Sequence, residues 1–183
     1  MPSRVATRRR SERGLIRGAQ AGSEADLEEL FRRHWRRAYR TAFLIVHDHA
    51  GAEDIAQEAF VAAIRTLDRF DRRRPFGPWL GRIVTNRAID WTRSRAARRE
   101  VDEQHTDAVA TEGAAVGGYS EDVVQALGQL SPEHRAVVVM RYVLEFTPGE
   151  IASALELPRG TVNSRLRRAL DVLDARLRET ELR

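Results

Sequence analysis

Residues 130–173 read LSPEHRAVVVMRYVLEFTPGEIASALELPRGTVNSRLRRALDVL and contain the signals that decide the fold. Ser131-Pro132-Glu133 marks a helix start, because serine is a good cap and proline suits the first helical position. A second start follows at Thr147-Pro148, and that short helix is expected to stop at Pro158. After a turn, Thr161 is expected to cap a third helix. This succession predicts a helix-turn-helix.

The outward-facing positions around that third helix carry side chains suited to reading DNA. Arginine can reach guanine edges with two hydrogen bonds, asparagine can pair with adenine, and serine can bind phosphate. The residues expected to contact a major groove are Arg159, Thr161, Asn163, Ser164, Arg165, Arg167 and Arg168. An ordinary helical hairpin with a polar outer face would show the same pattern, so the motif alone leaves both interpretations open.

Upstream of this motif, apolar residues recur at helical spacing in three further stretches. The spacing predicts helices over 23–46, 53–67 and about 78–95. Between the last two, FDRRRPFGP (70–78) interrupts the pattern with two prolines and a glycine, which indicates a loop. The arginines on the outer face of the 23–46 helix are expected to be solvated. No strand pattern competes, and the sequence predicts an all-α protein.

The organisation along the chain predicts two small helical domains joined by a flexible linker. Periodicity fades between Ala96 and Tyr119, where the sequence ends in GAAVGG. We expect a disordered basic N-terminus at 1–12, a first domain at 13–97, a linker at 98–119 and a second domain at 120–180.

Charge is distributed unevenly along the chain. Residues 1–100 carry 22 arginines against 13 acidic residues, a net charge of +9, whereas residues 101–119 carry −4 and residues 120–183 carry −1. A basic first half favours a polyanionic partner. All 31 basic residues are arginine. Codon bias explains this exclusive use of arginine, and so does a functional preference for guanidinium groups.

Two absences exclude whole classes of protein. The chain has no cysteine, so it contains neither a disulfide framework nor a thiolate metal site. The basic N-terminus is not followed by an apolar run of signal-peptide length, and no stretch approaches about 18 apolar residues. We therefore expect a cytoplasmic protein without a membrane segment and without a cofactor.

Three stretches in order resemble the extracytoplasmic-function (ECF) sigma factors of bacterial RNA polymerase, within the sigma-70 family. They are AGAEDIAQEAFVAAIRTLDRF (50–70), FGPWLGRIVTNRAIDWTRSRAARR (76–99) and the stretch 130–173 quoted above. The resemblance implies a sigma-2-like helical bundle followed by a sigma-4-like helix-turn-helix domain. It also implies promoter recognition at the minus-35 and minus-10 elements, with strand opening.

The resemblance assigns the helix at 53–67 to the clamp of the polymerase beta-prime subunit, so Asp54, Gln57 and Glu58 are expected to contact the core enzyme. An acidic, amide-bearing stripe in a basic half-chain fits a basic partner helix, although a solvated face shows the same pattern. The beta flap is the expected contact of the second domain. An anti-sigma factor is a further expected partner, and the acidic linker is expected to thread toward the active cleft.

The same resemblance places minus-10 recognition in the loop after Phe70 and the helix that follows. Phe70 and Asn86 match the positions that capture a flipped base, for which a flat apolar surface and an amide are suited. Trp79 is either part of the core or part of that platform. A cluster of arginines is expected to hold the strand backbone, namely Arg82, Arg87, Arg93, Arg95, Arg98 and Arg99.

Two other functions remain open on the residues alone. A helix-turn-helix regulator that binds duplex DNA by itself would share the C-terminal motif. A metal hydrolase would need His47, Asp48, His49, Glu53 and Asp54 to converge, but the two histidines fall in an expected loop without a ligand spacing. We therefore expect a protein that acts by binding rather than as an enzyme.

Overall fold

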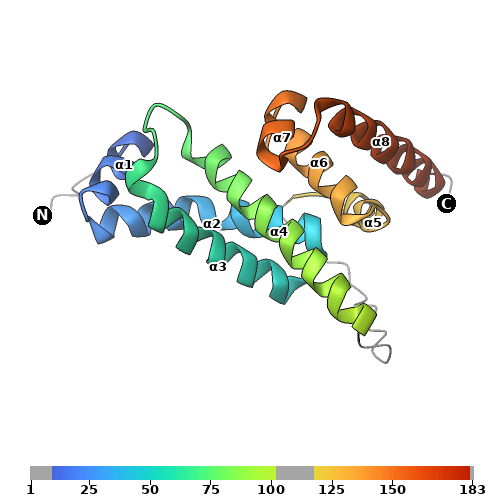
Figure 1. Ribbon diagram of the computed structural model, residues 1–183, viewed down its shortest axis with the longest axis horizontal. Helices are drawn as coiled ribbons and strands as arrows, with labels where there is room; N and C mark the ends of the chain where they lie inside the picture. The colour runs from blue at the N-terminus through green and yellow to red at the C-terminus, as the bar shows by residue number, and fades with distance from the viewer. Residues whose placement is uncertain (1–9, 102–117, 182–183) are drawn as a thin grey trace, which may run out of the picture.

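The structure is a computed structural model that describes residues 10–101 and 118–181 (Figure 1), and these residues form helices with no strand among them. The α-helices are α1 (Glu12–Gln20), α2 (Glu24–Val46), α3 (His49–Thr66), α4 (Phe76–Val101), α5 (Glu121–Gly128), α6 (Pro132–Tyr142), α7 (Pro148–Leu155) and α8 (Arg159–Glu181), and a short 3-10 helix, η1 (Leu67–Arg69), follows α3. The prediction of an all-α fold is confirmed. We call α1–α4 the N-terminal module and α5–α8 the C-terminal module.

Helix α2 is the central element of the N-terminal module, with α1, α3 and α4 packed against it. Its C-terminal half buries an uninterrupted run from Thr41 to Val46, including a fully buried Phe43. The helix ends at His47, which adopts the left-handed conformation, and Asp48 then caps α3 by accepting a hydrogen bond from the Gly51 N–H. The predicted break between the two helices is therefore only two residues long.

Helix α1 was not expected from the sequence. Ser11 caps it by accepting a hydrogen bond from the Gly14 N–H, and Leu15 and Ile16 are buried against the rest of the module. The residues just before it also differ from the prediction of a disordered N-terminus through residue 12. Arg10 pairs with the buried carboxylate of Asp26 at 2.6 Å.

Helix α4 extends beyond the predicted range at both ends. It begins at Phe76, with Pro78 in the first turn, where the missing N–H of proline has no cost. It continues to Val101 and thus includes the first residues of the expected linker. The remainder of that linker, at 102–117, lies outside the described residues.

The C-terminal module contains the predicted helix-turn-helix. Thr147 and Glu150 form a capping box at the start of α7, in which the Thr147 hydroxyl accepts from the Glu150 N–H and the Glu150 carboxylate accepts from the Thr147 N–H. Helix α8 begins at Arg159, three residues earlier than a cap at Thr161 predicts. The Pro158 carbonyl accepts the first N–H groups, so Thr161 lies in the first turn and is not the cap.

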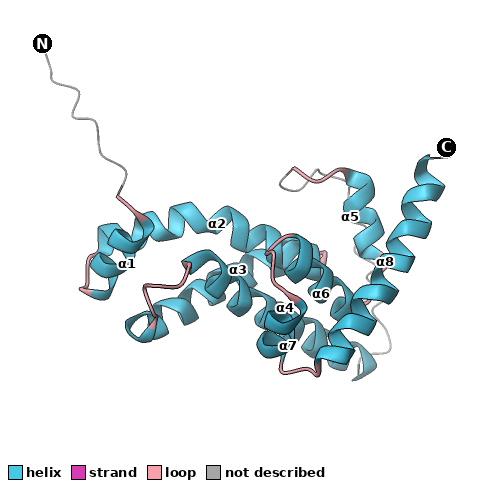
Figure 2. Ribbon diagram, turned by 90° about the horizontal axis from the view of Figure 1, so that it is seen from above, coloured by secondary structure: helices cyan, strands magenta, loops and turns pink. Residues whose placement is uncertain are grey.

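The two modules pack against each other in this structure, as Figure 2 shows from above. Residues Arg37, Leu44 and His47 lie on one face of α2, and this face contacts the C-terminal module. Arg37 donates to the Val143 carbonyl at 3.2 Å, so this arginine is not solvated as expected. Gly81 on α4 permits a close approach, since a Cβ there would lie 2.9 Å from Leu144.

His47 makes the stability of this arrangement sensitive to pH. Its ring stacks on Phe43 and faces Gly128, and burial, followed by the positive charge of Arg135, lowers the pKa of His47 from 6.5 to about 4. Within the described residues, the His47 Nε2 has no hydrogen-bond partner. The folded protein therefore resists protonation at a site that the unfolded chain protonates near pH 6.5.

Acidification from pH 7 to pH 4.5 is expected to lower the free energy of unfolding through His47 by about 2 kcal/mol. The loss accumulates between the unfolded pKa of 6.5 and the folded pKa of about 4, and it is absent above that window. Urea unfolding at both pH values, compared with His47→Asn, measures it. Asparagine tolerates the left-handed backbone and does not titrate. Equal acid losses in the two proteins would contradict the assignment.

Candidate nucleic-acid interface

Four residues predicted for minus-10 recognition line one pocket of about 350 Å³. Its walls come from the end of α3, from η1 and from one face of α4. Because positions 79, 82 and 86 are spaced by three and four, the helix presents them on the same side. The lining residues are Thr66, Arg69, Phe70, Trp79, Arg82, Ile83 and Asn86.

The floor of this pocket is aromatic. Phe70 lies 4.5 Å from Trp79 and 5.8 Å from Phe76 between ring centroids, and Phe76 lies 5.4 Å from Trp79. Phe70 is only 7% exposed, which is more buried than a free stacking platform requires, whereas Trp79 is half-buried. Trp79 therefore belongs to both the core and the pocket wall, the two interpretations that the sequence left open.

The rim of the pocket is polar. Arg82 is exposed, and the half-buried Asn86 donates a long hydrogen bond of 3.4 Å to the Ala154 carbonyl of α7. An apolar floor with an amide and a guanidinium at its edge suits a nucleobase, which offers a flat face and hydrogen-bonding edges. The C-terminal module lies against one side of this rim.

Four of the other arginines predicted for the minus-10 strand lie away from this pocket, and the side chain of the fifth, Arg99, lies outside the described part of the structure. Arg87 pairs with Glu58 of α3 at 2.7 Å, on a different face of α4. Arg95 pairs with Asp48 at 3.1 Å and lies over the Trp91 ring. Arg93 is exposed and does not line the pocket, and Arg98 lines a separate groove.

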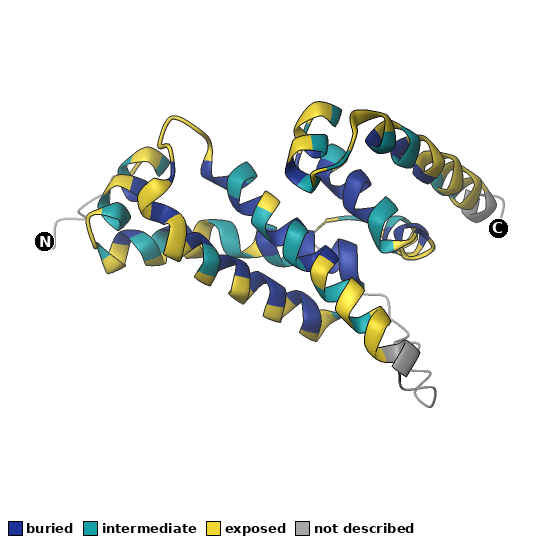
Figure 3. Ribbon diagram, viewed as in Figure 1, coloured by how far each residue is buried: buried dark blue, intermediate teal, exposed yellow. Residues whose placement is uncertain are grey.

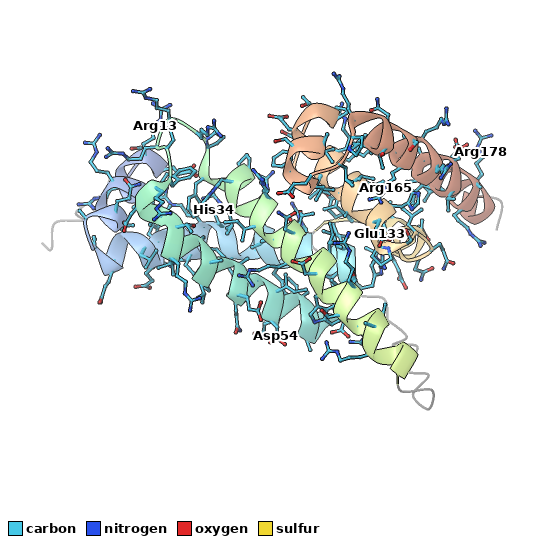
Figure 4. All side chains as sticks on the ribbon, viewed as in Figure 1. Arg13, His34, Asp54, Glu133, Arg165 and Arg178 are labelled. Carbon is cyan, nitrogen blue, oxygen red and sulfur yellow. The ribbon has the colours of Figure 1, made fainter. Side chains whose placement is uncertain are left out.

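That groove runs between α3 and α4, encloses about 770 Å³ and contains all three residues predicted to contact the polymerase core. Asp54, Gln57 and Glu58 are exposed along it, and Figure 4 shows Asp54 on the side of α3 that faces away from the C-terminal module. The exposed Val61 adds an apolar patch beside the acidic one. The lining also holds Arg65, Arg87 and Arg98, so the groove is mixed in charge and suits an amphipathic partner helix that carries both basic and acidic residues.

Helix α8 presents its predicted DNA-reading residues to solvent. Val162, Leu166 and Ala169 are buried and fix the inner face of the helix against the module. The opposite face is exposed as far as Arg178, the last residue of α8 whose burial is described (Figure 3). Arg159, Asn163, Arg167 and Arg168 are exposed, and Thr161, Ser164 and Arg165 are half-buried.

The residues considered for a metal hydrolase do not converge. His47 packs near the C-terminal module, Asp48 caps α3, and His49 shares a 2.7 Å hydrogen bond with Tyr39. Across 10–101 and 118–181, no group of three or more potential ligands is positioned to hold a metal ion. The same residues include no helix with the length and apolar character that a membrane span requires.

Sequence reasoning missed three residues of the pocket, namely Thr66, Arg69 and Ile83. A signal for them existed. Arg69 directly precedes Phe70, and Thr66 lies four residues before it. Ile83 is one helical turn beyond Trp79, so it shares the face of α4 that holds Trp79 and Asn86.

Two family models match the chain. Sigma-70 region 2 matches residues 30–98, and Sigma-70 region 4 matches residues 120–173. The first match contains the pocket and the α3–α4 groove, and the second contains the helix-turn-helix.

Curated relatives match nearly the whole chain. The ECF RNA polymerase sigma factor SigW of Bacillus subtilis (strain 168) is 32% identical over 172 residues, which cover 85% of this chain and 89% of SigW. The ECF RNA polymerase sigma factor SigL of Mycobacterium tuberculosis (strain H37Rv) is 32% identical over 169 residues, which cover 90% of this chain and 96% of SigL.

Solved structures agree on the fold. CnrH, in a complex with the cytosolic domain of CnrY, is 30% identical and superimposes with a TM-score of 0.59 over 92% of this chain and 97% of CnrH. The sigma factor RpoE of Bartonella quintana, in a complex with the anti-sigma factor NepR, has a TM-score of 0.69 at 24% identity, over 84% of this chain and 97% of RpoE. With region 2 and region 4 in order and relatives similar over most of their length, the chain belongs to the ECF RNA polymerase sigma factors.

Proposed function

We propose that this sigma factor binds core RNA polymerase through the α3–α4 groove, captures a minus-10 base in the pocket beside Phe70 and reads the minus-35 element with α8. The observation that carries this proposal is the pocket. It combines an aromatic floor with Asn86 and Arg82 at its rim. The family match supports the role, because the pocket lies within the region 2 stretch.

Base capture uses chemistry that the pocket residues supply. A base rotated out of the nontemplate strand loses its stacking, and the Trp79 and Phe70 surface replaces part of that loss. Asn86 offers both a donor and an acceptor to the edge of the base. Arg82 is positioned to hold the neighbouring phosphate by charge, which orients the strand without specifying its sequence.

The position of Asn86 links base capture to the C-terminal module. Its amide now donates to the Ala154 carbonyl at 3.4 Å, at the long end of hydrogen-bond distances. A base that took this donor would break one of the contacts between the modules. We therefore expect the α7 side of the interface to shift when the pocket is filled.

The C-terminal module provides two binding surfaces in this proposal. The exposed face of α8 enters the major groove of the minus-35 element. An apolar groove of about 430 Å³, lined by Leu127, Val138, Leu170 and Leu173 among others, suits the apolar face of a helix such as the beta flap would supply.

An anti-sigma partner is part of the proposal because the structural neighbour RpoE was solved with the anti-sigma factor NepR. Purification of the tagged chain from its own cells is expected to yield a partner protein in a fixed ratio. The chain then acts by binding, and the polymerase catalyses RNA synthesis.

Transcription in vitro tests the proposal. Core polymerase with this chain, given fragmented genomic DNA, is expected to start RNA at a small set of positions that share upstream motifs. Sequencing of the 5′ ends identifies those positions. Starts that are the same with and without the chain, or tight binding of the free chain to a palindromic operator at physiological salt, would favour the stand-alone regulator instead.

A further inference from the structure

Helix α1 contacts both ends of the loop that shapes the base pocket, although it lies outside the stretch that matches region 2. The loop, residues 70–75, runs from η1 to the start of α4. At one end, the Gln20 Nε2 donates to the Leu67 carbonyl at 2.8 Å and to the Phe70 carbonyl at 3.1 Å. At the other end, the Glu12 carboxylate accepts from the Phe76 N–H at 3.1 Å.

The chemistry of Gln20 fits the two acceptors. A short 3-10 helix leaves its last carbonyls without partners inside the helix. The Leu67 carbonyl receives the Phe70 N–H at 2.9 Å, and a side-chain amide supplies the additional donors that both carbonyls accept. A carboxylate at position 20 would face the same two oxygens with no donor.

These contacts determine where Phe70 lies. The Phe70 backbone is extended, so its carbonyl and its ring point in different directions from one Cα. With the carbonyl held by Gln20, the ring is placed against Trp79 at 4.5 Å, and this pair forms the pocket floor. Release of the carbonyl would free the Phe70 backbone to move, and the ring moves with its Cα.

Glu12 adds a second attachment point. Its Oε1 accepts from the N–H of the first residue of α4, Phe76, and its Oε2 lies 3.1 Å from the Nε2 of His34 on α2. The ring of His34 packs 5.0 Å from that of Phe76. The start of α4, which holds Trp79, is thus fixed to the same short helix that holds Phe70.

We propose that Gln20 is a positioning residue for base capture: its paired hydrogen bonds to Leu67 and Phe70 hold the aromatic floor of the pocket in the geometry that accepts a flipped base. This inference rests on the proposed function of the pocket. Gln20 acts on the base through the backbone of Leu67 and Phe70. It makes α1 a structural part of the promoter-opening site.

The test compares Gln20→Met with two controls in full-length holoenzyme. Methionine keeps the length and apolar stem of glutamine but has no donor. Gln129→Met makes the same replacement at an exposed position after α5, and Ile16→Val weakens the packing of α1 while Gln20 is retained. Affinity for core polymerase is measured for each protein and is expected to be unchanged.

The probe is single-stranded DNA. A pool randomised over six positions is selected on wild-type holoenzyme, and the best oligonucleotide is then compared with a version that has an abasic sugar at the most selective position. Gln20→Met is expected to bind the best oligonucleotide about tenfold more weakly than wild type does, because without the two hydrogen bonds only about a tenth of the molecules hold the pocket floor in the geometry that accepts a base. It should bind the abasic version as tightly as wild type does. Both control variants should bind both oligonucleotides as wild type does.

Each outcome separates this inference from the function on which it rests. If wild-type holoenzyme prefers no base at any single position, the proposed function of the pocket fails and the inference fails with it. If wild type is selective and Gln20→Met is equally selective, only the positioning role is overturned. If Gln20→Met weakens binding to both oligonucleotides alike, Gln20 acts through general stability and the inference is wrong. The same holds if Ile16→Val weakens binding to the best oligonucleotide, but not to the abasic one, as much as Gln20→Met does.

Discussion

Replacing Asp54 and Glu58 together with arginine is expected to weaken binding to core RNA polymerase by about 100-fold or more, because like charges placed across an interface cost several kcal/mol and each 1.4 kcal/mol is tenfold. Both side chains are exposed in the α3–α4 groove, one helical turn apart. The fold itself should tolerate the change. The Glu58–Arg87 pair is 65% and 37% exposed, and such surface pairs contribute about 0–1 kcal/mol.

A matched control has the same spacing and the same change in net charge. Glu24 and Glu28 are exposed acidic residues one turn apart near the start of α2, away from the groove. The double arginine variant at these two positions should bind core polymerase as wild type does. Equal affinities for wild type and the Asp54/Glu58 variant, measured by fluorescence anisotropy with labelled sigma factor, would remove the groove from the interface.

Replacing Asn86 with alanine is expected to slow promoter opening by about 10- to 100-fold, since a lost bidentate contact to a base costs about 1–3 kcal/mol. The loss should appear in the rate of stable open-complex formation, while affinity for core polymerase stays the same. The fold should tolerate the substitution, because the only bond from Asn86 to the C-terminal module that the structure records is long, at 3.4 Å. Thr92→Ala on the same helix is the control.

Phe70 is a less informative target for the same step. Its ring is 7% exposed and packs against Phe76 and Trp79, so truncation to alanine is expected to cost about 3–5 kcal/mol of stability. A defect in that variant would report unfolding as much as base capture. An Asn86 variant that opens promoters at the wild-type rate would contradict the base-pocket assignment.

Helical periodicity predicted most of the fold because most helices here are amphipathic and begin with clear caps. The break before Asp48 and the capping box at Thr147 are local signals, so the sequence contains them within a few residues. The start of α8 was predicted three residues late. Pro158 supplies a backbone carbonyl as the cap, and only side-chain caps are visible in a sequence.

The contribution of α1 could not be predicted in this way. The helix is nine residues long, and only Leu15 and Ile16 are buried, too few for a periodic signal. Gln20 donates hydrogen bonds to the carbonyls of Leu67 and Phe70, which lie 47 and 50 positions further along the chain. No local pattern records such a contact.

Helical geometry separates the pocket residues of α4 from neighbouring arginines that were predicted to act with them. Arg82 and Asn86 are four residues apart and share a face of α4, whereas Arg87 is rotated by about 100° from Asn86. Arg87 therefore points to α3 and meets Glu58. The packing of the two modules is different in kind. Arg37 was expected at a solvated surface and His47 lies in the predicted break, but no local pattern records that each contacts the C-terminal module.

Permanganate reactivity of unpaired thymines at a promoter found by start-site sequencing tests the central claim most directly. Core polymerase with this chain is expected to expose thymines between the minus-10 element and the start site, and core polymerase alone is expected to expose none. The holoenzyme with Asn86→Ala should show the same binding with much weaker reactivity. Identical reactivity with and without the chain would contradict the claim that this protein opens promoter DNA.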